Sequence, residues 1–76
     1  MKIPNELKIM WDAFLIREFG DIFDAVDVFI IDKEICLTFN AHDGSWRIYK
    51  RDGLSVTFIE LESDEANEIT RLHFSE

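Results

Sequence analysis

The chain has 76 residues, of which 47% are apolar and 32% are charged. This length leaves room for one small core and excludes a multidomain or cofactor-rich enzyme. Sixteen acidic residues against eight basic ones give a formal net charge of −8. Such a charge disfavours nucleic acids and anionic membrane surfaces as partners and favours basic ones. We expect residues 1–76 to form a single folded domain.

An amphipathic helix is predicted over residues 5–19, because apolar residues recur there at helical spacing and Gly20 follows the last turn. The apolar positions are Leu7, Met10, Trp11, Phe14 and Leu15. Residues 21–25 are expected to add a further short turn of helix. The helix should bury Trp11 against a sheet, since its apolar stripe needs a partner.

Four antiparallel strands are expected after the helix, at residues 26–32, 34–40, 45–51 and 54–61. Polar segments separate the strands, and Asp52-Gly53 is a strong signal for a tight turn. The more apolar set of alternating side chains should face the helix. This set consists of Ile35, Leu37, Phe39, Trp46, Ile48, Val56 and Phe58.

Residues 63–74 fit either a helix or a strand. Acidic residues near the start and basic ones near the end suit a helix dipole, whereas Thr70, Leu72 and Phe74 alternate like a strand. We favour the helix. The expected fold class is therefore α+β, with an N-terminal amphipathic helix packed on a four-stranded antiparallel β-meander and a short C-terminal helix, or alternatively a fifth strand.

The first strand is apolar on both faces, although a meander leaves that strand at the edge of the sheet. Val26, Val28 and Ile30 alternate there with Phe29 and Ile31. An exposed apolar edge invites pairing with another chain. We therefore expect either the C-terminal segment or a second copy of the chain to cover this strand.

No catalytic, metal or cofactor site is predicted. Cys36 and the two histidines, His42 and His73, are not spaced for nucleophilic catalysis or for zinc. Asp21 and Asp24 lack the glycine and the terminal glutamate of a calcium loop. The three glycines are too far apart to form a phosphate-binding loop.

The expected location is the cytoplasm. The only cysteine, Cys36, can form no disulfide within the chain, and its place in an apolar strand is typical of a reducing compartment. Pro4 and Glu6 interrupt any early apolar run, so no signal peptide is predicted. No stretch approaches the roughly 20 apolar residues of a membrane span.

Basic and aromatic residues are interleaved around Arg47 and Tyr49, a pattern that can stack and clamp single-stranded nucleic acid. The net charge of −8 argues against direct nucleic-acid binding. Strand alternation predicts that Arg47 and Tyr49 face away from the helix. Because tyrosine and arginine are frequent in protein interfaces, this face is a predicted contact surface.

Five carboxylates occur within nine residues near the end of the chain, with no lysine or arginine among them. If the fourth strand continued through Glu60, Glu62 and Asp64, these side chains would share one face about 6.6 Å apart. Such a row imitates the charge repeat of a nucleic-acid backbone and can occupy a basic groove. A second, looser acidic series includes Asp21 and Asp24. The alternative interpretation is a solvated face that keeps the domain soluble.

These patterns indicate a small acidic, non-catalytic protein that masks or inhibits a basic partner of nuclease or nucleic-acid-processing type. Its composition is that of nucleic-acid mimics and immunity proteins, which is an analogy of class. The predicted partner-binding residues are Glu60, Glu62, Asp64, Glu65, Glu68, Asp21, Asp24, Arg47 and Tyr49. A homodimeric structural or regulatory subunit is the alternative, and an enzyme is the third and weakest hypothesis.

Overall fold

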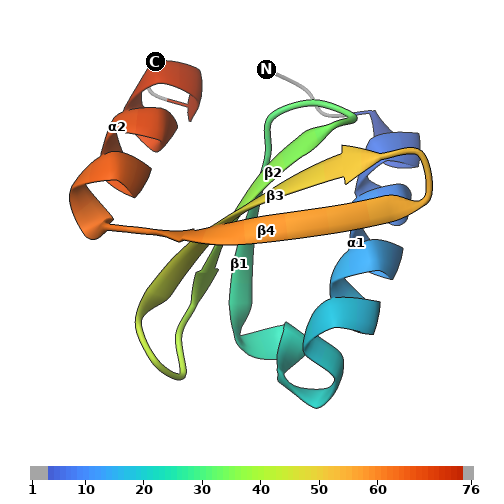
Figure 1. The fold of residues 1–76 in the computed structure, drawn as a ribbon, viewed down its shortest axis with the longest axis horizontal. Helices are drawn as coiled ribbons and strands as arrows, with labels where there is room; N and C mark the ends of the chain where they lie inside the picture. The colour runs from blue at the N-terminus through green and yellow to red at the C-terminus, as the bar shows by residue number, and fades with distance from the viewer. Residues whose placement is uncertain (1–3, 75–76) are drawn as a thin grey trace.

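A computed structural model describes residues 4–74, without the side chains of Asp21, Asp24 and Phe74. In chain order the elements are α1 (Asn5–Phe19), the 3-10 helix η1 (Gly20–Ala25), β1 (Val26–Ile30), β2 (Ile35–Asn40), β3 (Ser45–Asp52), β4 (Ser55–Leu61) and α2 (Ser63–Phe74). The strands form one antiparallel sheet in the order β1-β2-β3-β4 (Figure 1). The predicted α+β fold is confirmed, and the C-terminal element is a helix. None of the helices in the described region is long and apolar enough to cross a membrane.

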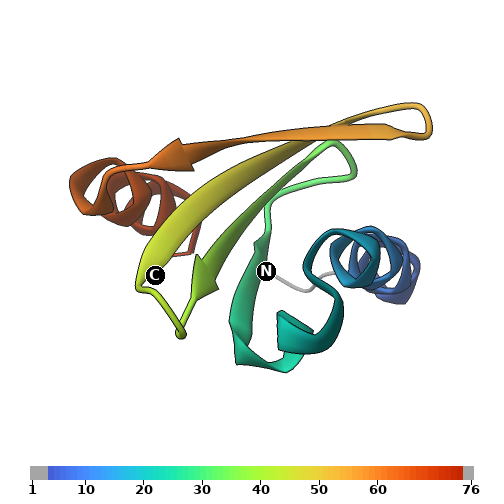
Figure 2. The same cartoon turned by 60° about the horizontal axis from the view of Figure 1, so that its bottom comes forward.

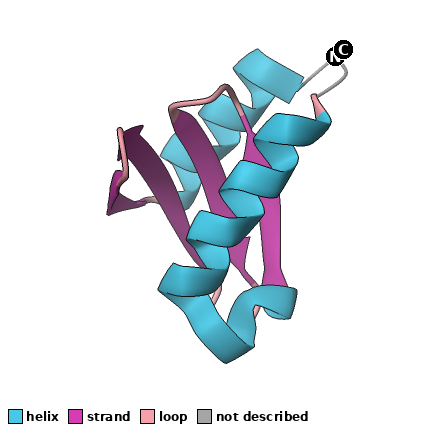
Figure 3. Ribbon diagram, turned by 90° about the vertical axis from the view of Figure 1, so that its right-hand side faces the viewer, coloured by secondary structure: helices cyan, strands magenta, loops and turns pink. Residues whose placement is uncertain are grey.

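The two α-helices lie on opposite faces of the sheet, as Figures 2 and 3 show. Successive strand residues point to opposite faces, so the register divides the sheet residues into two sets. The set beneath α1, which we call the α1 face, includes Val26, Val28, Ile30, Cys36, Thr38, Asn40, Ser45, Arg47, Tyr49, Arg51, Val56, Phe58 and Glu60. The opposite set, which we call the α2 face, includes Asp27, Phe29, Ile35, Leu37, Phe39, Trp46, Ile48, Lys50, Thr57, Ile59 and Leu61.

The main core lies between α1 and the α1 face of the sheet. Its buried members are Trp11, Leu15, Phe19, Val26, Ile30, Cys36 and Tyr49. The expected burial of Trp11 is confirmed, since its side chain is fully buried. The Trp11 indole N–H also donates a hydrogen bond of 2.9 Å to the carbonyl oxygen of Asp32. This bond ties α1 to the turn between β1 and β2.

The prediction of which strand residues face α1 is wrong for much of the sheet. Val56 and Phe58 lie on the α1 face as expected, whereas Ile35, Leu37, Phe39, Trp46 and Ile48 lie on the α2 face. The physical reason is that helices cover both faces, so the more apolar set is not obliged to face α1. On the α2 side, Ala66 of α2 is fully buried, and α2 contacts β3.

The two apolar faces of β1 are both in use within the chain. Val26 and Ile30 are buried in the core beneath α1. On the other face, the ring of Phe29 stacks on that of Trp46 with 5.9 Å between the ring centroids. The apolar pattern of this edge strand therefore has an explanation within one chain, and pairing through β1 stays a prediction.

A two-residue turn, Gly53-Leu54, joins β3 to β4 and is closed by the pair Asp52 and Ser55. Gly53 has a φ of 63°, which suits the first central position of a type II′ turn, where glycine is favoured. The Asp52-Gly53 turn signal of the sequence is thereby confirmed. This turn sets the register of β4 at the free edge of the sheet.

Candidate functional site

The five predicted carboxylates surround the junction between β4 and α2. We call them the acidic segment: Glu60, Glu62, Asp64, Glu65 and Glu68. All five residues are exposed. The condition for a single row along one strand is not met, because β4 ends at Leu61 and α2 begins at Ser63. The carboxylates instead pass from a strand to the first turns of a helix.

Glu65 caps the start of α2. Its side-chain Oε1 accepts a hydrogen bond of 3.1 Å from the backbone N–H of Glu62, and the carbonyl oxygen of Glu62 accepts one of 3.0 Å from the N–H of Ala66. Glu62 is therefore the N-cap residue, and Glu65 plays the part of the acidic residue in a capping box. Glu65 follows Glu62 by three residues at the start of a helical segment, which is the spacing of a capping box. This signal was present in the sequence but was not used to predict the cap.

Removal of the cap should destabilise the fold modestly. We expect Glu65→Ala to lower the free energy of unfolding by about 1 kcal/mol, the usual cost of losing a capping hydrogen bond. Glu65→Gln should retain most of the stability, because an amide oxygen still accepts the bond. Urea denaturation of both variants checks this. An equal loss in the two variants would assign the effect to charge rather than to the cap.

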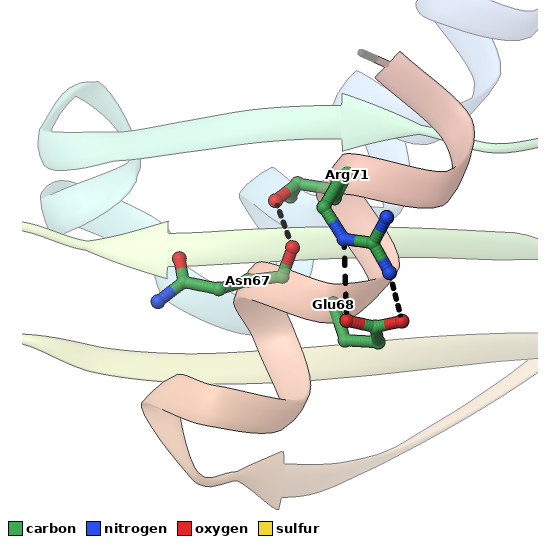
Figure 4. Close-up of polar contacts among 4 residues, drawn as sticks. Asn67, Glu68 and Arg71 are labelled. Atoms are coloured by element: carbon green, nitrogen blue, oxygen red, sulfur yellow. Dashed lines mark hydrogen bonds and ion pairs between the residues drawn. The ribbon is translucent and has the colours of Figure 1, made fainter.

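Glu68 has an internal partner. The guanidinium of Arg71 faces its carboxylate (Figure 4), with a hydrogen bond of 3.3 Å from Nε to Oε2 and a second contact from the terminal nitrogen to Oε1. Glu68 is therefore neutralised by Arg71, which lies three residues beyond the end of the acidic segment. Both side chains are exposed, so the pair contributes little to stability.

Glu60 behaves differently, although a basic residue lies beside it. The register sets Glu60 directly across from Arg47, yet within residues 4–74 no ion pair joins the two. The Arg47 guanidinium lies 4.5 Å from the ring centroid of Phe58 and 5.1 Å from that of Phe19, and it donates a hydrogen bond of 3.3 Å to the Tyr49 hydroxyl. These contacts hold the guanidinium among aromatic rings, and the Glu60 carboxylate stays in solvent.

The prediction that Arg47 and Tyr49 face away from α1 is wrong. Both residues lie on the α1 face; Tyr49 is fully buried and Arg47 is half-buried. The Tyr49 ring centroid lies 5.7 Å from that of Phe19 and 5.1 Å from that of Phe58. Burial raises the pKa of the Tyr49 hydroxyl above its ordinary value. Tyr49 is thus a core residue with its hydroxyl satisfied by Arg47.

The second acidic series does not join the first. Asp21 and Asp24 belong to η1, which adjoins α1 and β1, whereas α2 adjoins β3. Their side chains lie outside the described part of the structure. Among the side chains that are described, no three from His, Cys, Asp and Glu come together in a way that could hold a metal ion.

An open apolar depression of about 290 Å³ lies next to β4. Its lining residues are Ile35, Ile48, Lys50, Thr57, Phe58 and Ile59. None of them belongs to α2, so this part of the sheet is left uncovered by the helix. Strand alternation predicted that Ile35 and Ile48 face α1, and no pattern in the sequence indicated this surface.

Comparisons of the chain with protein-family models, with curated proteins and with solved structures found no match. The function is accordingly argued from the residues of this chain and their geometry.

Proposed function

We propose that this chain is a small acidic, non-catalytic protein that binds a basic partner and masks the surface with which that partner holds nucleic acid. The contact residues are Glu60, Glu62 and Asp64. The observation that carries this assignment is the exposure of these carboxylates without an ion pair within residues 4–74, even where Arg47 is the cross-strand neighbour of Glu60.

The charge of the molecule supports the same partner class. Within the described residues, ion pairs join Lys8 to Asp12 and Arg71 to Glu68. Each pair joins one acid to one base, so the net charge of −8 is not reduced by them. An uncompensated field of this size attracts basic surfaces over several ångströms and accelerates their association. Glu65 and Glu68 are not among the proposed contact residues. The Glu65 carboxylate caps α2, and the Glu68 carboxylate pairs with Arg71.

The experiment starts from capture of partners on the immobilised protein, followed by binding kinetics with the purified partner. We expect a basic partner whose association slows by at least about tenfold between about 0.05 M and about 0.5 M NaCl, since the Debye length shrinks over that range. Adding this protein to a complex of the partner with nucleic acid should also displace the nucleic acid. An acidic partner, or an association rate that salt leaves unchanged, would contradict the proposed function.

Neutralising the contact residues gives a sharper prediction. The triple variant Glu60→Gln, Glu62→Gln and Asp64→Asn should slow association about tenfold or more and change the thermal midpoint little, because exposed carboxylates contribute little to stability. Surface plasmon resonance and thermal denaturation measure the two effects.

A matched control triple keeps the change in net charge the same. Glu6→Gln, Glu34→Gln and Asp52→Asn alter three exposed residues; Glu34 and Asp52 lie at the end of the sheet opposite the β4–α2 junction. We expect this control to slow association far less. If the two triple variants slowed association equally, Glu60, Glu62 and Asp64 would act only through the net charge and not as contact residues. The acidic segment would then be a solvated face.

Cytoplasmic location is part of the same proposal. It is supported by Cys36, a free thiol that is fully buried in the core, since cysteines without a disulfide partner are typical of reducing compartments.

A further inference from the structure

The outer edge of β4 carries backbone groups that no strand within residues 4–74 pairs. The N–H of Arg51 donates a hydrogen bond of 2.8 Å to the carbonyl oxygen of Glu34, so the backbone of Arg51 points toward β2 and away from its β4 neighbour, Val56. Antiparallel ladders alternate residue by residue. Val56, Phe58 and Glu60 therefore direct their backbone N–H and C=O groups outward from the sheet, where another strand can pair with them.

This edge is complementary to itself. If a second copy approaches antiparallel with Phe58 opposite its own equivalent, Val56 of each copy faces Glu60 of the other. The three outward-pointing residues then pair only among themselves, which satisfies every open position on both edges. Such a pairing has two-fold symmetry, the commonest symmetry of protein dimers.

The same register joins the apolar depressions of the two copies. Thr57 of one copy lies opposite Ile59 of the other, and both residues line the depression on the α2 face. Directly opposed side chains on one face are close enough to contact. Ile59 is 64% exposed in the single chain. In the dimer it would contact the second copy, and the apolar surface would continue from one sheet to the other.

Like charges are kept apart in this arrangement. Glu60 faces Val56 of the second copy. No carboxylate opposes another along the paired strands. The two chains, each with a net charge of −8, repel one another at long range, and salt screens this repulsion.

We propose that a second copy of this chain docks on β4, with antiparallel pairing of the two β4 strands about Phe58 and one continuous sheet through both copies. We place the contact on β4 in preference to the β1 pairing predicted from the sequence, because the apolar side chains of β1 already pack within the chain. Side chains of strand residues stand perpendicular to the sheet, so the Glu60 carboxylates stay on the sheet face and remain available. This dimer does not depend on the partner-binding function proposed above.

Sedimentation equilibrium at rising protein concentration tests the association. We expect a mass that approaches twice the monomer mass of 9.0 kDa, and a stronger dimer at about 0.5 M than at about 0.05 M NaCl because repulsion is screened. The salt dependence of partner binding has the opposite sign, so the failure of one proposal is distinguishable from the failure of the other. A monomer at millimolar concentration in high salt would overturn the dimer.

Two matched substitutions locate the contact. Ile59→Lys and Ile9→Lys each replace an isoleucine that is 64% exposed, one on β4 and one on α1, and each lowers the net negative charge equally. We expect Ile59→Lys to raise the dimer dissociation constant at least about tenfold, because the ammonium group is forced against an apolar surface. Ile9→Lys should leave the constant unchanged. Equal effects would overturn the assignment to β4.

Amide hydrogen exchange supplies a readout at the backbone. On dimerisation the N–H groups of Val56, Phe58 and Glu60 should become protected, while those of β1 should not change. Thr57→Lys, at an exposed position on the same edge, should abolish that protection and serves as the second variant if Ile59→Lys fails to fold. Protection of β1 instead, or protection of β4 only when a different protein is bound, would overturn the proposal.

Discussion

Trp11→Ala should lower the free energy of unfolding by about 3–5 kcal/mol, the usual range for the loss of a large buried aromatic side chain. Trp11 is fully buried, and its ring meets that of Phe14 edge to face with 6.1 Å between the centroids. Its N–H also donates to the Asp32 carbonyl, in a turn where the Asp32 side chain accepts hydrogen bonds from two further backbone N–H groups. Truncation thus removes packing and the link between α1 and this turn together. Denaturant titration followed by circular dichroism measures the loss.

Two comparison variants separate the contributions. Trp11→Phe keeps an aromatic ring and removes the hydrogen bond. It should lower the free energy of unfolding by less than Trp11→Ala does. Ile9→Ala alters an exposed residue of the same helix and should change stability by no more than about 0.5 kcal/mol. A Trp11→Ala loss no larger than that of Ile9→Ala would show that α1 does not depend on this side chain.

The fold could be predicted from the sequence because its signals are local. The spacing of apolar residues predicted a helix over 5–19, where α1 lies. The Asp52-Gly53 pair predicted the turn that joins β3 and β4, and Gly53 has the positive φ that such a turn needs. The charges at the two ends of 63–74 favoured the helix that is observed as α2.

The direction in which strand residues face could not be predicted in the same way. Alternation divides a strand into two sets, but it does not say which set α1 covers when helices lie on both faces. Arg47 and Tyr49 were therefore assigned to an exposed surface, although Tyr49 is fully buried and Arg47 is stacked between the rings of Phe19 and Phe58. These contacts join residues far apart in sequence, and no short pattern encodes them.

In the candidate site, too, local contacts could be predicted from the sequence and long-range contacts could not. Both the cap from Glu65 to Glu62 and the pair of Glu68 with Arg71 have a spacing of three residues, so the sequence contained the signal for them. The unpaired state of Glu60 depends instead on the capture of Arg47 by aromatic rings from α1 and β4. Only the fold distinguishes the carboxylates that serve the helix from those left in solvent.

Alkaline solution should destabilise the protein through Cys36. Burial, with a smaller contribution from the charge of Asp12, raises the pKa of the Cys36 thiol from 9.0 to about 12. Between these two values the unfolded chain has lost the thiol proton and the folded chain still holds it, so stability falls as the pH rises from about 9 to about 12. The thiol alone should account for a loss of about 4 kcal/mol at the upper end of this window. The raised pKa of Tyr49 acts in the same direction.

The variant Cys36→Ala isolates the part of this pH dependence that belongs to the thiol. It should be less stable than the parent protein at pH 7, because a fully buried side chain is shortened. As the pH rises above about 9, the parent protein should lose stability faster than the variant, and the two curves should converge or cross. Guanidinium titrations at closely spaced pH values measure both curves. The contribution of Tyr49 is common to both proteins, so parallel curves would show that the Cys36 thiol does not hold its proton in the folded state.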